Sequence, residues 1–262
     1  MREWLIVFAA FCGSSALAQS PTAEQKAQVA PAGALRAAIV KIPFLAKQDA
    51  GGALKGVAPE LAEAMARILG VPYQPVAFDS PNAGIKALRD GAADVTFLAP
   101  TPERAGLIDF APAFMQMEVT LIVPGSSPIQ TLADADQPGR RIVVYERTAN
   151  DEMVQKRLTR ATIVRVPLFG WKQAFEMVRA GQADAYVDLR DQLVSHQSEL
   201  PGSRIIAESL GRNAMAIGYR KDAPLAAMFM RQFTDTVVLQ GTVRSAIERA
   251  GIKGAVVPNR EL

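Results

Sequence analysis

The sequence predicts an α/β fold made of two lobes, with the second lobe inserted into the first. Strand-like and helix-like patterns alternate over residues 35–251, which is typical of layered α/β proteins. The composition breaks at residues 124–127, Pro-Gly-Ser-Ser, directly after a continuous apolar strand. A second α/β run follows, and a late strand at residues 213–219 leads into two closing helices. This order indicates a lobe, a crossing, an inserted lobe and a crossing back.

The helix at residues 59–69 is the clearest element of the first lobe. Apolar side chains recur on one of its faces, Pro59 stands near its start, and Gly70 follows its end. The other elements expected here are strands at 35–42, 71–78 and 94–98 and a short helix at 82–90. We expect this first part of lobe 1 to span residues 34–118.

The second α/β run supplies lobe 2, expected at residues 119–217. After it, the chain returns to lobe 1 over residues 218–262 and finishes with helices that close that lobe. The expected strands are 119–123, 141–145, 163–166, 185–187 and 213–219, and the expected helices are 149–158, 171–180, 225–239 and 243–251.

Residues 1–18 are predicted to be a cleavable signal peptide. Arg2 precedes an apolar run at residues 4–11, and Ala16-Leu17-Ala18 forms the small-residue cleavage pattern. The run is too short to cross a membrane, since a spanning helix needs roughly 20 apolar residues. We therefore expect a periplasmic protein that is cleaved after Ala18, with a flexible, Ala/Pro-rich leader at residues 19–33.

The composition argues against several function classes. The single cysteine, Cys12, lies in the predicted signal peptide, and His196 is the only histidine, so disulfides, thiol chemistry and Cys/His metal sites are not expected. The net charge is only +3, and basic and acidic residues are interleaved without Lys/Arg blocks. That pattern disfavours a nucleic-acid partner. We expect no metal and no cofactor.

The most informative segment is residues 99–104, Ala-Pro-Thr-Pro-Glu-Arg. Thr101 is a good N-cap and Pro102 suits the first position of a short helix. Backbone N–H groups at a helix start attract anions, and the planar guanidinium of Arg104 matches a carboxylate. The segment therefore predicts a carboxylate-binding corner with Thr101 and Arg104 as contacts. The alternative is an ordinary strand-to-helix turn with a surface arginine.

Several sequence blocks resemble motifs of the family 3 extracellular solute-binding proteins, which serve ABC transporters for amino acids and related solutes. In chain order they are residues 56–62, similar to G-x-x-x-D/E-L-A; 88–94, similar to L-x-x-G-x-x-D; 101–114, similar to T-P-E-R-x-x-x-x-D-F-S-x-P-Y; and 179–185, similar to G-x-x-D-A. The order and spacing of the blocks together carry the resemblance. The resemblance covers nearly all of the chain after residue 18.

The resemblance implies two Rossmann-like lobes joined by two crossing strands, the periplasmic binding protein type II-like architecture. Such lobes close on a ligand by hinge motion, and the ligand sits at the carboxyl ends of strands. It also implies a small-molecule ligand and an ABC transporter permease in the inner membrane as partners. We expect the protein to act as a monomer.

The resemblance also suggests binding residues. Arg104 matches the arginine that pairs with the ligand's α-carboxylate, and Phe44 matches an aromatic wall of the pocket. Thr148, with Asp151 three residues on, resembles the opposing helix start in lobe 2 and fits a capping box. Asp188 is the nearest candidate for the aspartate that pairs with an α-ammonium.

The sequence also departs from the family pattern. Ala99 stands where a hydroxyl is common, Arg147 replaces a glycine before Thr148, and Asp188 comes one residue early with Arg190 after it. A small organic acid is therefore an alternative to an α-amino acid, with Arg147 or Arg190 as a second positive contact. The alternative for Asp188 is a solvated strand-end acid paired with Arg190, and the alternative for Phe44 is simple packing in the core.

The leading functional prediction is a binding protein without catalysis that captures a small carboxylated solute. The alternatives are a periplasmic lyase on the same scaffold, similar to cyclohexadienyl dehydratases, and a soluble partner of a sensor. A lyase needs a placed acid, for which Glu118, Glu146 and Asp188 are candidates. We expect His196 to be exposed in a polar stretch and Trp171 to pack at the start of its helix.

Overall fold

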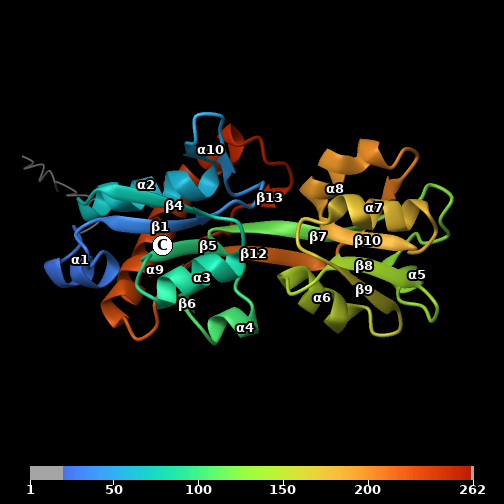
Figure 1. The fold of residues 1–262 in the computed structure, drawn as a ribbon, viewed down its shortest axis with the longest axis horizontal. Helices are drawn as coiled ribbons and strands as arrows, with labels where there is room; N and C mark the ends of the chain where they lie inside the picture. The colour runs from blue at the N-terminus through green and yellow to red at the C-terminus, as the bar shows by residue number, and fades with distance from the viewer. Residues whose placement is uncertain (1–19, 261–262) are drawn as a thin grey trace, which may run out of the picture.

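The computed structural model describes residues 20–260 as two α/β lobes joined by two long strands (Figure 1). The predicted signal peptide, residues 1–18, lies outside the described residues. In the part of the chain that the structure describes, no helix is long and apolar enough to cross a membrane. The predicted α/β class, with two lobes and two crossing strands, is confirmed.

Lobe 1 consists of a sheet with helices packed against it (Figure 1). Its strands are β1 (Leu35–Val40), β4 (Tyr73–Phe78), β5 (Val95–Leu98), the short β6 (Asp109–Phe110) and β12 (Gly211–Tyr219). Its helices are α1 (Ala23–Val29), α2 (Val57–Leu69), α3 (Pro81–Arg89), α4 (Pro102–Ala105), α9 (Pro224–Leu239) and α10 (Thr242–Arg249). The strand order is β4-β1-β5-β12; β1 is parallel to β4 and β5, and β12 is antiparallel to β5.

Lobe 2 repeats this plan with the strand order β7-β10-β8-β9. Its strands are β7 (Met115–Val123), β8 (Arg141–Tyr145), β9 (Thr162–Val166), β10 (Ala185–Leu189) and the short β11 (Arg204–Ile205). Its helices are α5 (Leu132–Ala135), α6 (Ala149–Arg157), α7 (Trp171–Arg179), α8 (Arg190–His196) and the 3₁₀ turn η1 (Gln197–Glu199). β8 is parallel to β9 and β10, whereas β7 is antiparallel to β10.

The strands β7 and β12 belong to both lobes. They pair with each other in antiparallel register from Gly211↔Val119 to Met215↔Met115. Beyond this stretch the two strands separate, because β7 continues along β10 in lobe 2 and β12 continues along β5 in lobe 1. The short strand β13 (Ala255–Val256) adds to β7 at the same place. This ladder therefore joins the two lobes.

The same kind of ion pair fixes the start of β1 in lobe 1 and of β8 in lobe 2. In lobe 1, Asp94 accepts from the backbone N–H of Arg36 at 2.8 Å and pairs with its guanidinium at 2.6 Å. In lobe 2, Asp184 accepts from the backbone N–H of Arg141 at 2.8 Å and pairs with its guanidinium at 3.4 Å. Both aspartates close a G-x-x-D block, so these blocks have a structural explanation.

The predicted flexible leader at residues 19–33 is wrong for the segment that forms α1. Thr22 and Gln25 form a capping box, in which each side chain accepts from the other residue's backbone N–H, at 3.1 and 2.9 Å. Val29 is buried, and the side chain of Gln28 accepts from two N–H groups at the start of α9. The segment is thus an integral helix of lobe 1.

The remaining differences concern elements with little apolar periodicity. Helix α8 was not predicted, because only Leu193 of its residues is buried and the rest of its pattern is polar. The hairpin of β2 (Lys47–Gln48) and β3 (Leu54–Lys55) was also missed. β7 begins at Met115, earlier than the expected start at residue 119, since polar residues alternate along its first half. Helix α8, the β2–β3 hairpin and the first half of β7 therefore depend on contacts with other segments rather than on a local apolar pattern.

The Asp94 ion pair predicts a large effect on stability. Replacing Asp94 by alanine is expected to cost about 3–5 kcal/mol, because N–H groups of Arg36 then lose an acceptor where the carboxylate is only 1% exposed. Asp184→Ala is the matched control and is expected to cost about half as much, since Asp184 is 23% exposed. Urea titration of both variants measures the difference. Equal losses would contradict this account.

Candidate functional site

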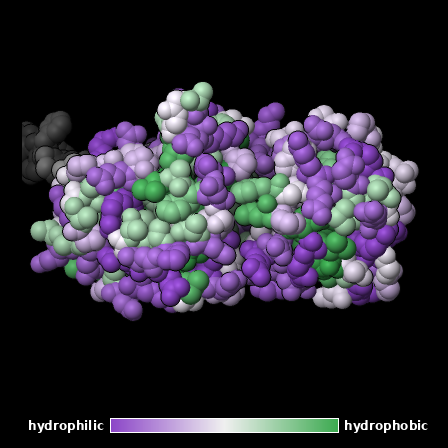
Figure 2. Space-filling view, viewed as in Figure 1, coloured by the Kyte–Doolittle hydropathy of each residue, from purple (hydrophilic) through white to green (hydrophobic). Residues whose placement is uncertain are grey.

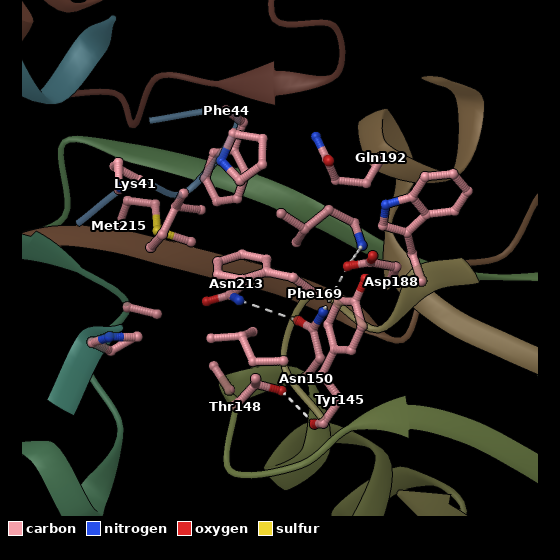
Figure 3. Close-up of a pocket in the computed structure, with 18 of the residues that line it drawn as sticks. Lys41, Phe44, Tyr145, Thr148, Asn150, Phe169, Asp188, Gln192, Asn213 and Met215 are labelled. Atoms are coloured by element: carbon pink, nitrogen blue, oxygen red, sulfur yellow. Dashed lines mark hydrogen bonds between the residues drawn. The ribbon is translucent and has the colours of Figure 1, made fainter. Parts of the chain in front are cut away.

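A cavity of about 230 Å³ lies between the lobes and is lined by side chains from both (Figure 3). Lobe 1 contributes residues 41–44, Ala99 and Arg104, and the crossing strand β12 contributes Asn213 and Met215. Lobe 2 contributes the turn from β8 into α6, the end of β10 and the segment between β9 and α7. Figure 2 shows apolar residues on both sides of the boundary between the lobes.

The cavity lies where parallel strands of both lobes end. Residues 41–44 follow β1, Ala99 follows β5, Tyr145 ends β8, and Leu189 ends β10. In open α/β sheets the carboxyl ends of strands are the usual place for ligands, because the loops there can carry varied side chains without disturbing the sheet. The topology therefore makes this cavity the candidate binding site.

Arg104 is a buried cation without an anionic partner. Its side chain is 9% exposed, and its Nη1 donates to the carbonyl oxygen of Ala99 at 2.9 Å. No carboxylate within residues 20–260 lies at salt-bridge distance from it. Burial lowers the pKa of Arg104, while the charges of Glu103 and Glu152 oppose that change. Because Nη1 is the only guanidinium nitrogen of Arg104 with an acceptor within residues 20–260, the group is available to a ligand carboxylate.

Thr101 has a structural role in this corner. Its hydroxyl accepts from the backbone N–H of Arg104 at 3.2 Å and caps α4, as its N-cap position predicts. Thr101 is buried and is not among the residues that line the cavity. Thr101 therefore positions Arg104, whereas Ala99 and Arg104 themselves line the cavity.

Asp188 is a buried acid of lobe 2 that lines the cavity (Figure 3). It accepts hydrogen bonds from the hydroxyl of Tyr186 at 2.6 Å and from the backbone N–H of Leu189 at 2.7 Å. Burial raises the pKa of Asp188 to about 6, although both hydrogen bonds act in the opposite direction. No cationic side chain within the described residues lies at salt-bridge distance from this carboxylate. It is therefore available to a cationic group of a ligand.

The pairing of Asp188 with Arg190, one of the alternatives drawn from the sequence, does not occur. Arg190 instead forms an ion pair with Glu118 and donates to the backbone carbonyls of Ile206 and Ala207. Arg147 has a left-handed backbone, φ 56°, and neither arginine lines the cavity. Neither one supplies the second positive contact that the sequence suggested. Lys41 does line the cavity, but its Nζ is 2.6 Å from Asp79.

A short polar chain connects the crossing strand to Asp188. Asn213 of β12 donates to the side chain of Asn150 at 3.1 Å, and Asn150 makes a longer contact of 3.4 Å to Asp188 (Figure 3). Both asparagines are buried and line the cavity. The sequence analysis did not predict a role for either asparagine. The available signal was Asn213, a polar residue that begins the otherwise apolar strand expected at residues 213–219.

Thr148 lines the cavity and caps α6. Its hydroxyl accepts from the backbone N–H of Asp151 at 3.2 Å and donates to the carbonyl of Tyr145 at 2.9 Å. The expected capping box is incomplete, because Asp151 accepts from the N–H of Arg147 and pairs with Arg165 instead. The start of α6 therefore faces the cavity with its cap already satisfied.

Aromatic rings make up much of the lining. Phe44 packs in the core of lobe 1 and also lines the cavity, so both interpretations of this residue apply. His196, expected to be exposed, is half-buried, because α8 brings its ring onto Trp171 with a centroid distance of 4.1 Å and an interplanar angle of 11°. Trp171 packs against Phe175 as expected and lines the cavity as well.

The described residues offer no obvious metal centre. No group of three His, Cys, Asp or Glu side chains within residues 20–260 could hold a metal ion. The chemistry that the cavity does offer is one unpaired guanidinium, one unpaired carboxylate, two linked asparagines and several aromatic rings. Such a site can bind and orient a small polar molecule.

A family comparison agrees with this geometry. The model of the bacterial extracellular solute-binding proteins, family 3, matches residues 36–242, which is well over half of the chain. This chain belongs to that family. The match confirms the resemblance and contains every motif block from residue 56 to residue 185. Among curated proteins none matches significantly.

Solved structures with the same fold include amino-acid-binding proteins. An ancestral amino acid-binding protein, AncCDT-1, a precursor of cyclohexadienyl dehydratase, is 23% identical over 86% of this chain and 97% of its own, with a TM-score of 0.67. The solute receptor for L-cysteine of Neisseria gonorrhoeae is 21% identical over 86% and 92%, with a TM-score of 0.68. A putative ABC transporter binding component from Wolinella succinogenes, complexed with lysine, is 19% identical over 83% and 95%, with a TM-score of 0.69. These structural similarities show that this chain has the same fold as the three proteins.

The raised pKa of Asp188 predicts a pH-dependent stability. Its folded-state pKa of about 6 lies above the ordinary 3.8, so the folded protein holds the proton more tightly than the unfolded chain. The tighter proton binding adds roughly 3 kcal/mol to the free energy of unfolding. This stabilisation is complete below pH 4 and is lost as the pH rises through 6. Asp188→Asn should therefore be more stable than the parent at pH 7.5, and this advantage should shrink towards pH 4.

Urea titration at the two pH values measures this effect. Asp191→Asn, in helix α8, is the matched control because Asp191 is not buried. A pH-independent difference for Asp188→Asn would contradict the burial argument.

Proposed function

We propose that this family 3 protein is the periplasmic binding component of an ABC-type uptake system and captures a small carboxylated solute between its lobes. The observation that carries the proposal is the buried guanidinium of Arg104, which lines the cavity without an anionic partner in the described residues. A buried, unpaired charge is costly for a folded protein. A ligand carboxylate in the cavity offsets that cost through charge-assisted hydrogen bonds.

The position of Asp188 supports an α-amino acid within this ligand class. Arg104 comes from lobe 1 and Asp188 from lobe 2, and both line one cavity. A zwitterion placed between them matches each charge with its opposite. Because Arg190 is bound to Glu118, it does not compete for Asp188. A simple organic acid would use Arg104 and leave Asp188 without a cation, so it should bind more weakly.

Ligand binding is coupled to lobe closure in this proposal. In this proposal helix α1 and residues 34–118 and 218–262 move as one body, residues 119–217 move as the other, and the β7–β12 ladder is the hinge. A ligand that contacts both bodies stabilises the closed arrangement, and closure excludes water and strengthens the charge pairing. We infer that a permease recognises the closed form of the monomer after residues 1–18 are removed.

The arginine assignment predicts a selective loss of binding. A ligand is first found by thermal-shift screening of amino acids, dicarboxylates, amines and aromatic acids, since binding raises the melting temperature. Arg104→Ala should then weaken its affinity by about 100-fold or more in calorimetry, because two charge-assisted hydrogen bonds are lost. Arg104→Lys is the matched control and should retain part of the affinity, since it keeps the charge without the planar fork. Unchanged affinity in Arg104→Ala would refute the site.

A second candidate function is a lyase on the same scaffold, and the environment of Asp188 favours it. A buried carboxyl group with a pKa of about 6 can donate a proton near neutral pH. The other acids considered from the sequence are less suitable, because Glu118 is paired with Arg190 and Glu146 is exposed outside the cavity. Asp188 is therefore the one of these three that a lyase would use.

Incubation with prephenate separates the two functions. A binding protein is expected to leave prephenate unchanged over many hours at micromolar protein, as followed by ultraviolet absorbance. Turnover that disappears in Asp188→Asn would establish the lyase instead. The control variant Glu146→Gln, at an exposed position outside the cavity, should not affect such turnover.

A further inference from the structure

Aromatic side chains from both lobes line the cavity. Lobe 1 supplies Phe44, and lobe 2 supplies Tyr145, Phe169, Trp171 and His196. They come from separate segments, namely the loop after β1, the end of β8, the turn before α7 and the end of α8. The sequence therefore gives no cluster, and only the fold brings these rings to one cavity.

Phe169 has the most informative backbone. Its φ is 65°, a left-handed conformation that is unfavourable for a bulky residue, and its side chain is 39% exposed. Figure 3 shows its ring in the cavity. The turn is fixed by the hydrogen bond from the N–H of Gly170 to the carbonyl of Pro167 at 2.9 Å. Strain of this kind persists mostly at functional sites, and here it presents an apolar ring to the cavity.

The other rings of lobe 2 are held in place by their neighbours. Trp171 stacks on His196 and packs edge-on against Phe175 at a centroid distance of 6.0 Å. Tyr145 packs edge-on against Tyr186 at 5.8 Å. Burial also lowers the pKa of His196, which favours its neutral ring. Because these rings are already ordered, a ligand loses little further conformational freedom when it binds against them.

If a ligand's carboxylate binds Arg104 and its ammonium binds Asp188, the cavity lining has few other charged groups to contact the ligand's side chain. Lys41 is paired with Asp79, and the lining contains no acid other than Asp188 among the described residues. A cationic side chain would therefore lack a partner, and burying it unpaired would be costly. The remaining lining suits an uncharged, planar group.

We propose that the bound solute carries an aromatic ring, and that Phe169 of lobe 2 and Phe44 of lobe 1 hold this ring when the lobes close. The inference rests on the proposed binding of a carboxylate at Arg104 and specifies the rest of the molecule. The ligand is then an aromatic amino acid or a small aryl carboxylic acid. Aromatic pairs are stabilising beyond the area they bury, so the ring itself contributes to lobe closure.

Calorimetry with matched ligand pairs tests the ring. The pairs are L-phenylalanine with L-leucine, and phenylacetate with cyclohexylacetate. The aromatic member of each pair should bind about tenfold more tightly, because it combines stacking with burial. If the saturated members bind equally well or better, the aromatic inference is overturned while the carboxylate function stands. If L-glutamate or L-arginine binds better than every aromatic compound, the inference is also overturned. If no carboxylate binds at all, both proposals fail.

Variants at Phe169 test whether this side chain holds the aromatic ring of the ligand. Phe169→Asn removes the ring and keeps the left-handed backbone, which asparagine tolerates, so the free protein should melt no lower than the parent. Its affinity for the aromatic ligand should fall about tenfold, whereas Phe169→Tyr should stay within about threefold. Val194→Ala, an exposed apolar position on α8 outside the cavity, is the matched control and should bind like the parent. Unchanged affinity in Phe169→Asn would overturn the assignment of this residue.

Discussion

The antiparallel pairing of β7 with β12 is the constraint on which the rest of the structure depends. Each strand leaves the shared ladder into the sheet of a different lobe, so the ladder fixes where the lobes meet. Asn213 and Met215 lie on this ladder and also line the cavity. The hinge and the candidate binding site therefore share backbone. A ligand that touches these residues acts directly on the element that sets the angle between the lobes.

The electrostatics of the cleft differ from those of the surrounding protein. Two other cations near the cleft are paired, Lys41 with Asp79 and Arg190 with Glu118. Burial pushes both Arg104 and Asp188 towards their neutral forms, lowering one pKa and raising the other. The free protein bears this cost, and a ligand with complementary charges offsets it. Such a trade between stability and binding is expected where a site must await its ligand.

In each lobe the two ends of one strand serve different purposes, because one end is anchored by an ion pair and the other end leads into the cavity. An aspartate anchors the start of β1 in lobe 1, where Asp94 holds Arg36, and the start of β8 in lobe 2, where Asp184 holds Arg141. The opposite, carboxyl ends of these strands lead into the cavity. These carboxyl ends are free to differ in ligand contacts, which fits the varied ligands named for structures of this fold.

The sequence by itself determined the alternation of elements, the helix caps and the corner around Arg104, because each depends on residues a few positions apart. It did not determine α1 as part of lobe 1, the position of His196 or the partner of Arg190. Only the tertiary structure brought Arg104 and Asp188 to one cavity and gave Arg190 to Glu118. The physical reason is that burial and charge pairing depend on segments distant in the chain, which no local pattern records.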